Sequence, residues 1–304
     1  MNILCLLIII ITWNHSSSMP LLLIDLSHTF SSTIPFYPSQ TRFNFTQRTA
    51  TWTSGDNSFF YSTNSFITSE HIGTHIDAPY HFYLTGWKVD EIPLKHLVSV
   101  HARLIDVSKQ CQKNKNYLIA IDDVKKIDLY IPKIDEDTGD DFFFVLIFYT
   151  GWTKYWPDQN TYAGENSNIE FPGLSEQLAT YLVDTYGKNL VGVGIDTLST
   201  DYGLSKTYPV HQILAKNNKY GLENVALVDS LRQNVDDNFF TLDIIPMKIG
   251  NGTGAPCRII ARIDNSRRNS VNWFGFLVFF FILFLIGFFF KVVYDLKYNP
   301  NKSF

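Results

Sequence analysis

Three histidines and one aspartate are concentrated in the segment 71–81, whose sequence is HIGTHIDAPYH. They are His71, His75, Asp77 and His81. Imidazole and carboxylate groups are the side chains that bind Zn²⁺ or Mn²⁺ without redox chemistry. The types and spacing of these residues therefore predict a metal site, and such a site can support hydrolysis. The alternative is a histidine-rich edge strand that binds no metal.

Neither a helix nor a straight strand would bring these four side chains to one ion. A helix would place His71 and His75 on one face, but it would turn Asp77 elsewhere. In a straight strand, which rises about 3.3 Å per residue, His71 and Asp77 would lie roughly 20 Å apart. The chain must therefore bend, and Gly73 is the residue that permits a tight bend. We predict a curved loop around a metal, with Pro79 fixing the direction in which the chain leaves.

The elements that would hold this loop belong to one domain, which we place at residues 19–265. The chain has 304 residues, of which 45% are hydrophobic and 18% charged, enough for one sizeable core. Continuous apolar runs at 142–149 and 190–195 predict buried strands, and the periodicity of 174–186 predicts a helix. We expect an α/β fold with a mixed sheet and a site at strand ends. The net charge of −4, without a basic stripe, argues against nucleic-acid binding.

Both ends of the chain resemble targeting segments. Residues 1–18 contain an apolar run followed by serines, which is typical of a signal peptide; an uncleaved anchor or a start at Met19 are the alternatives. Trp273–Phe290 has no charge and no proline, which predicts a transmembrane helix, with a buried core helix as the alternative. Residues 266–304 would form this helix and a short cytoplasmic tail. The expected localisation is a single-pass membrane protein whose catalytic domain is extracellular or lumenal.

Two further features depend on that localisation. Cys111 and Cys257 could form a disulfide in an oxidising compartment, and two free buried thiols are equally consistent with the sequence. The sequences that begin at Asn44 and Asn251 match the glycosylation pattern Asn-x-Ser/Thr. In a secreted glycoprotein, both would be exposed on the surface.

Distant residues must complete the site, because one metal-binding loop rarely supplies every ligand. His211 and Glu223 flank a segment just after the predicted strand 190–195, and Asp196 and Asp201 also lie there. Any of these side chains could reach an ion at the strand ends. Position alone, however, favours a surface or supporting role for each of them.

The order of short motifs along the chain resembles the cyclase family, which includes bacterial-type kynurenine formamidases and isatin hydrolases. The segment 71–82 is similar to the family signature H-x-G-T-H-x-D-x-P-x-H-F. Each motif alone is weak, but their order over most of the domain is strong. The further matches are Asp25-Leu26-Ser27, Pro35-Phe36-Tyr37-Pro38, Thr150-Gly151-Trp152, Phe171-Pro172-Gly173-Leu174-Ser175, the segment 194–201, Pro246-Met247-Lys248 and the segment 254–258.

This resemblance implies a fold and a set of metal ligands. The fold would be the family's swivelling β/β/α domain, which is usually a homodimer. His71, His75 and Asp77 would bind a first divalent ion, Zn²⁺ or Mn²⁺. Asp77, His211 and Glu223 would bind a second ion or complete the first.

The resemblance also implies the reaction. His81 would be the proton donor and acceptor, and Tyr37, which stands where the formamidases carry a substrate-stacking tryptophan, would contact an aryl ring. The implied reaction is metal-dependent hydrolysis of N-formyl-L-kynurenine to L-kynurenine and formate, a step of tryptophan catabolism. The alternatives are another amide or cyclic amide such as isatin, or a non-catalytic membrane-anchored binding ectodomain. No G-x-S-x-G motif is present, which argues against the α/β-hydrolase type of formamidase.

Overall fold

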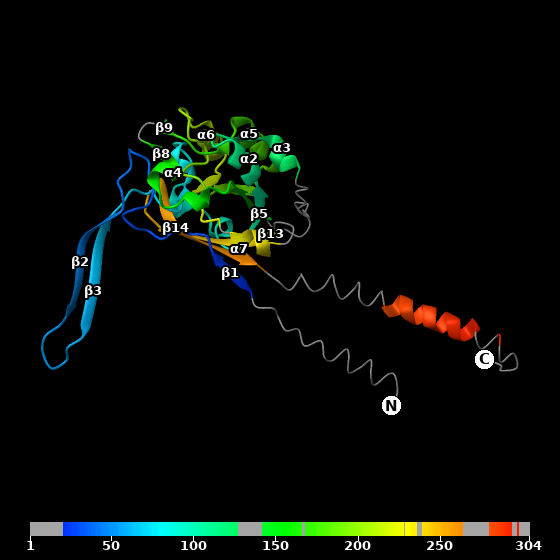
Figure 1. Ribbon diagram of the computed structural model, residues 1–304. Helices are drawn as coiled ribbons and strands as arrows, with labels where there is room; N and C mark the ends of the chain where they lie inside the picture. Colours follow the sequence, from blue (N-terminus) through cyan, green and yellow to red (C-terminus); the bar gives the residue numbers. More distant parts are fainter. Residues whose placement is uncertain are drawn as a thin grey trace. The chain divides into compact units, whose positions relative to one another are not determined.

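A computed structural model of the protein describes residues 21–126, 142–165, 168–227, 229–235, 239–263, 280–293 and 297. The chain divides into two compact units, and Leu23–Ile263 form the larger one. Every element that positions the candidate site belongs to this larger unit (Figure 1).

A mixed sheet of eight strands forms the centre of the larger unit, in the order β1-β14-β13-β5-β7-β11-β12-β4. Strand β14 also pairs with β4, so all strands except β1 form a closed ring. The pairs from β5 through β7 and β11 to β12 are parallel, and those of β13, β14 and β4 are antiparallel. The strands are β1 (Leu22–Asp25), β4 (His75–Asp77), β5 (Val100–Asp106), β7 (Phe144–Tyr149), β11 (Leu190–Ile195), β12 (Tyr220–Glu223), β13 (Phe239–Pro246) and β14 (Gly254–Ile263).

The swivelling β/β/α arrangement expected from the sequence is therefore wrong, because the mixed sheet is closed rather than stacked in layers. Closure rests on β4, which has only three residues and pairs with β12 on one side and β14 on the other. So short a strand shows no alternation of apolar and polar residues. The sequence pattern could not reveal that this segment joins the two ends of the sheet.

The core confirms the strongest local predictions. Every residue of β7 and β11 is buried, as their continuous apolar sequences predict. Helix α5 (Glu176–Tyr186) packs on these strands through Leu178 and Leu182. It begins after Ser175, whose hydroxyl accepts a hydrogen bond from the Leu178 N–H at 3.2 Å, and Gly187 follows its end with φ of 48°. The other helices are α2 (Ser108–Lys113), α3 (Ile121–Lys125), α4 (Gln159–Ala163), α6 (Pro209–Lys216) and α7 (Asp229–Asn234), with short 3₁₀ helices at Pro79–His81, Val89–Glu91, Leu94–His96 and Trp152–Tyr155.

Among the described residues, three small two-stranded sheets lie outside the ring. The largest is a long hairpin of β2 (Asn44–Trp52) and β3 (Phe60–Ile67), which pair with each other and extend from the rest of the unit (Figure 1). The other two pair β6 (Leu118–Ile119) with β10 (Gly173–Leu174), and β8 (Gly164–Glu165) with β9 (Asn168–Ile169).

The predicted membrane anchor requires a correction. Residues 280–293 are helical and belong to the smaller unit. Among the described residues, however, no helix is both long and apolar enough to cross a membrane. The predicted transmembrane helix and the single-pass membrane localisation are therefore wrong. The predicted signal peptide, at residues 1–18, lies outside the described residues.

Candidate metal centre

The segment 71–81 contains the bend that its composition predicts. Gly73 has φ of 63°, a left-handed conformation that favours glycine, and a Cβ added there would lie 2.4 Å from the Phe30 ring. After this bend the chain forms β4, and Pro79 then opens a 3₁₀ turn that ends at His81. The bend and the turn place the histidines on either side of a three-residue strand.

Strand β4 brings distant residues together because it has a partner on each side. Asp77 lies opposite Gly221 of β12 and Gly254 of β14. In the same register, His75 lies opposite Glu223 of β12. The closed sheet, and not the sequence spacing, therefore carries Glu223 to the segment 71–81.

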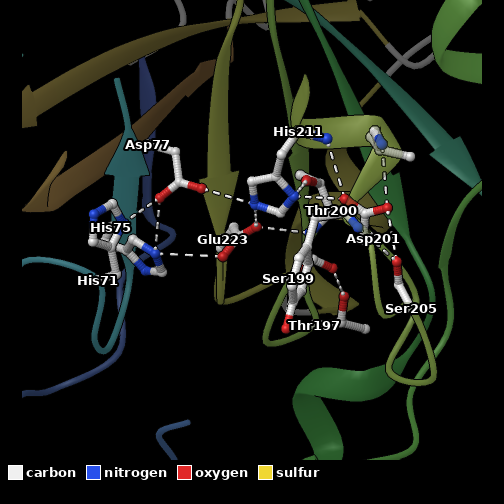
Figure 2. Close-up of polar contacts among 12 residues, drawn as sticks. His71, His75, Asp77, Thr197, Ser199, Thr200, Asp201, Ser205, His211 and Glu223 are labelled. Carbon is white, nitrogen blue, oxygen red and sulfur yellow. Dashed lines mark hydrogen bonds and ion pairs between the residues drawn. The ribbon is translucent and has the colours of Figure 1, made fainter. Parts of the chain in front are cut away.

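Five side chains converge at this point (Figure 2). The His75 Nε2 atom is 3.2 Å from Asp77 Oδ1 and 3.4 Å from Glu223 Oε2. The His211 Nε2 atom, from helix α6, is 3.1 Å from Asp77 Oδ2 and 3.1 Å from Glu223 Oε1. The His71 Nδ1 atom is 2.6 Å from Asp77 Oδ1. Both carboxylates thus lie between imidazole nitrogens from two separate parts of the chain, the segment 71–81 and helix α6.

The cluster fits a divalent cation. The His75 Nδ1 atom contacts the Gly73 carbonyl at 2.9 Å, so Nδ1 carries a hydrogen and Nε2 faces the two carboxylates. The His75 Nε2 atom is buried and has no hydrogen-bond partner. Two buried carboxylates facing this nitrogen need a cation between them, which is either a proton on Nε2 or a bound metal ion. Ligand atoms of His75, Asp77 and Glu223 lie within 4.8 Å of one another, as do those of His71, Asp77 and His81.

Neighbouring charges keep the carboxylates ionised. Burial alone would raise the pKa of Asp77, but His71 and the hydrogen bonds from His211, His71 and His75 outweigh it and hold that pKa well below its usual range. Burial and the charge of Asp77 act to raise the pKa of Glu223, but hydrogen bonds from His211 and His75 outweigh them and lower it. Both side chains therefore offer negatively charged oxygens to an ion.

Asp201 orients His211. Its Oδ2 atom lies 2.6 Å from the His211 Nδ1 atom and accepts a hydrogen bond from the His211 backbone N–H at 3.1 Å (Figure 2). The Nδ1 proton therefore points to Asp201, and Nε2 faces the cluster. The Glu223 carboxylate is also held by the backbone, because the Thr200 N–H donates a hydrogen bond to Glu223 Oε1 at 2.7 Å.

His81 lies next to the cluster. Its ring stacks on His71 with centroids 3.9 Å apart, and it is 6.1 Å from the His211 ring. Burial lowers the pKa of His81 to about 4, so its imidazole is neutral near pH 7. With Asp77 and His211 it lines a cavity of about 10 Å³, roughly the space of one water molecule.

Tyr37 also lies near the cluster. It is half-buried and packs edge to face on Phe171 with centroids 6.5 Å apart. Burial, and then the charge of Glu223, raise the pKa of Tyr37, while a hydrogen bond with Ser199 lowers it. The phenol is therefore close enough to Glu223 to be affected by its charge.

The remaining candidates take other positions. Asp196 accepts hydrogen bonds from the Thr150 N–H and hydroxyl at 2.8 and 2.6 Å and from the Trp152 N–H at 2.8 Å, so it holds the loop after β7. Cys111 and Cys257 are both buried free thiols.

Sequence reasoning missed Glu70 and Thr253, which contact His71 through a hydrogen-bonded chain. The sequence analysis considered Thr253 only as part of a glycosylation pattern, and no local pattern singles out Glu70.

The closed mixed sheet, with three histidines and two carboxylates gathered in one buried cluster, defines an enzyme of the metal-dependent hydrolase class. The family described as putative cyclase matches residues 24–202. The chain belongs to this family. The alternative of a non-catalytic binding domain is therefore set aside.

Individual relatives agree with this assignment. The chain is 29% identical over 240 residues to a kynurenine formamidase of Geobacillus thermodenitrificans, covering 79% of this chain and 96% of that one. It is 27% identical over 217 residues to an isatin hydrolase of Roseibium aggregatum, covering 68% and 77%. The solved structure of isatin hydrolase A from Labrenzia aggregata, bound to benzyl benzoate, superposes with a TM-score of 0.66 at 25% identity and covers 85% of this chain and 99% of that one.

Proposed function

We propose that the protein hydrolyses an aryl formamide, with N-formyl-L-kynurenine as the substrate and L-kynurenine and formate as the products. This would place it in tryptophan catabolism. The observation that carries the proposal is the buried cluster of His75, Asp77 and Glu223, whose ligand atoms lie close enough together to hold one cation. The similarity to a kynurenine formamidase over 96% of its length supports the choice of substrate.

The proposed ligands are the five clustered side chains. His71, His75 and Asp77 would hold a first Zn²⁺ or Mn²⁺, and Asp77, His211 and Glu223 a second ion or the remaining positions around the first. When bound, a divalent ion in such a site supplies an activated water near neutral pH and polarises the substrate carbonyl. The nitrogen and oxygen ligands suit either metal.

His81 is the proposed general base and acid. Its neutral ring, stacked on His71, can accept a proton from the attacking water. Water adds to the formyl carbon, the carbon–nitrogen bond breaks, and His81 returns the proton to the departing amine. A positioned base of this kind contributes about 10²–10⁴-fold to the rate. Tyr37 would contact the aryl ring of the substrate.

A second candidate function is hydrolysis of a cyclic amide such as isatin. The likeness to isatin hydrolases in sequence and in structure favours it. The same water addition and the same proton transfer through His81 would open the ring, with the amine remaining attached to the product. The homodimer expected from the family remains a prediction for either substrate.

An assay of the purified protein with N-formyl-L-kynurenine and with isatin, before and after exhaustive chelation, separates these functions. We expect turnover of the formamide that is lost on chelation and restored by added Zn²⁺ or Mn²⁺. Preference for isatin would favour the second function. Turnover that persists without metal would contradict both.

A further inference from the structure

Both ring nitrogens of His71 are engaged by side chains. The Nδ1 atom lies 2.6 Å from Asp77 Oδ1, and the Nε2 atom lies 2.7 Å from Thr253 Oγ1. The Thr253 hydroxyl in turn donates to Glu70 Oε2 at 2.5 Å. A continuous chain of short contacts therefore runs from Glu70 through Thr253 and His71 to Asp77.

The donors along this chain can be assigned by counting protons. The hydroxyl of Thr253 has a single proton, and the carboxylate of Glu70 accepts it. Toward His71 the hydroxyl oxygen can then only accept, so the His71 Nε2 atom must carry a hydrogen. The Nδ1 atom, which faces Asp77 Oδ1, is then the ring nitrogen whose hydrogen a bound cation would replace.

The backbone around Thr253 fixes this arrangement. The Thr253 N–H donates to the same Glu70 oxygen at 3.0 Å, and the Thr253 carbonyl accepts from the Ala78 N–H at 2.9 Å. The Thr253 hydroxyl is thereby held between Glu70 and the strand β4 that carries His75 and Asp77. The loop cannot rotate the hydroxyl away from His71 without breaking these contacts.

We propose that Thr253 and Glu70 are positioning residues that hold His71 in the Nε2–H tautomer, so that Nδ1 is its metal-binding atom. The inference rests on the metal site of the proposed function. Residues that hold a histidine ligand in one tautomer commonly change metal affinity by about 10–100-fold when they are removed. The threonine of the Asn251–Thr253 pattern thus has a role in the site that does not involve glycosylation.

Thr253→Val tests the hydroxyl, because valine keeps the branched shape and removes the donor and acceptor. We expect the Zn²⁺ affinity of the metal-free protein, measured by competition with a chelating dye, to fall by about 10–100-fold. Thr253→Ser should restore most of it. Glu70→Gln, which can offer its amide N–H to the hydroxyl, should also weaken binding. Thr241→Val is the matched control, since the Thr241 hydroxyl contacts the Arg262 carbonyl on the same sheet, away from the cluster.

A second measurement keeps the inference separate from the proposed function. Imidazole ¹⁵N shifts of the Zn²⁺-loaded protein, with the His71 signals assigned from a His71→Gln variant, report which ring nitrogen carries the hydrogen. We expect the Nε2–H form in the wild type and a loss of that preference in Thr253→Val. A Nδ1–H form in the wild type would overturn the inference, as would wild-type Zn²⁺ affinity in Thr253→Val or equal weakening in Thr253→Ser. Failure to hydrolyse any formamide would count only against the proposed function.

Discussion

His75 and Glu223 lie directly opposite each other on the antiparallel strands β4 and β12, with 3.4 Å between His75 Nε2 and Glu223 Oε2. The closure of the sheet produces this contact, because β4 fills the gap between β12 and β14. The strand that completes the fold thus also carries central residues of the candidate metal centre. Changes that disturb the packing of β4 should therefore impair metal binding.

Two glycines that flank Asp77 offer a matched test of this coupling. A Cβ added at Gly254 would lie 2.5 Å from His71 Cε1 and 2.6 Å from the Ile76 carbonyl oxygen. A Cβ at Gly221, on the other side, would meet Thr200 and Asp77 at ordinary distances of 3.5 and 3.6 Å. We expect Gly254→Ala to displace His71 and weaken Zn²⁺ binding at least about tenfold, while Gly221→Ala binds nearly as the wild type. Equal affinities in a dye-competition titration would count against the coupling.

His81→Gln tests the proposed proton transfer. Because His81 acts beside the ion and not as a ligand in this proposal, we expect metal content close to the wild type and a loss of kcat of about 10²–10⁴-fold. Metal analysis and steady-state kinetics on the same preparation provide the two readouts. An unchanged kcat would reject the role, and loss of the metal would indicate that His81 is itself a ligand.

Asp201→Asn tests the orientation of His211. An amide can present its NH₂ group to His211 Nδ1 and so favour the tautomer that places a hydrogen on Nε2, facing the cluster. We expect the Zn²⁺ affinity to fall by about 10–100-fold. Asp243→Asn, which alters a carboxylate that accepts from the Ser99 N–H, is a control on the same sheet. The orientation argument fails if the two variants bind Zn²⁺ equally well.

His28 should make stability depend on pH. Burial, against an opposing effect of Asp25, lowers the pKa of His28 from its ordinary value of 6.5 to about 4. Between these values the unfolded chain binds more protons than the folded one, so the free energy of unfolding should fall as the pH drops from 6.5 to about 4. At about 1.4 kcal/mol for each pKa unit, a shift from 6.5 to about 4 corresponds to about 3–4 kcal/mol.

His28→Phe isolates this contribution because it can keep the stacking on Trp156, where the ring centroids are 3.9 Å apart. Urea unfolding of the metal-free wild type and variant should be compared between about pH 4 and 7, which spans the shift in the pKa of His28. We expect the difference in unfolding free energy to shift in favour of the variant as the pH falls. Parallel profiles would show that His28 does not carry the effect.

The sequence predicts the local features of this protein better than it predicts which distant segments lie side by side. His71, His75, Asp77 and His81 could be selected because they share one short segment with a glycine where the chain must bend. His211 and Glu223 could be chosen only through the family resemblance, because the strand pairing that brings Glu223 opposite His75 leaves no trace in local periodicity.

One error concerns the predicted membrane span. The apolar composition of Trp273–Phe290 indicated such a span, yet no described helix has the required length and apolarity. The glycosylation pattern at Asn251 stays a prediction, and the hydroxyl of its Thr253 lies between Glu70 and His71. A pattern of residue types is compatible with more than one role, so composition alone does not decide between them.

The central claim is that His75, Asp77 and Glu223 are ligands of bound divalent metal. Anomalous diffraction at the zinc edge from crystals grown with Zn²⁺ tests it directly. We predict that His75 Nε2 and an oxygen of each carboxylate each lie within about 2.0–2.2 Å of a zinc peak, whether the cluster holds one ion or two. A peak elsewhere, or a fully occupied zinc that leaves His75 Nε2 without a ligand bond, would contradict the account.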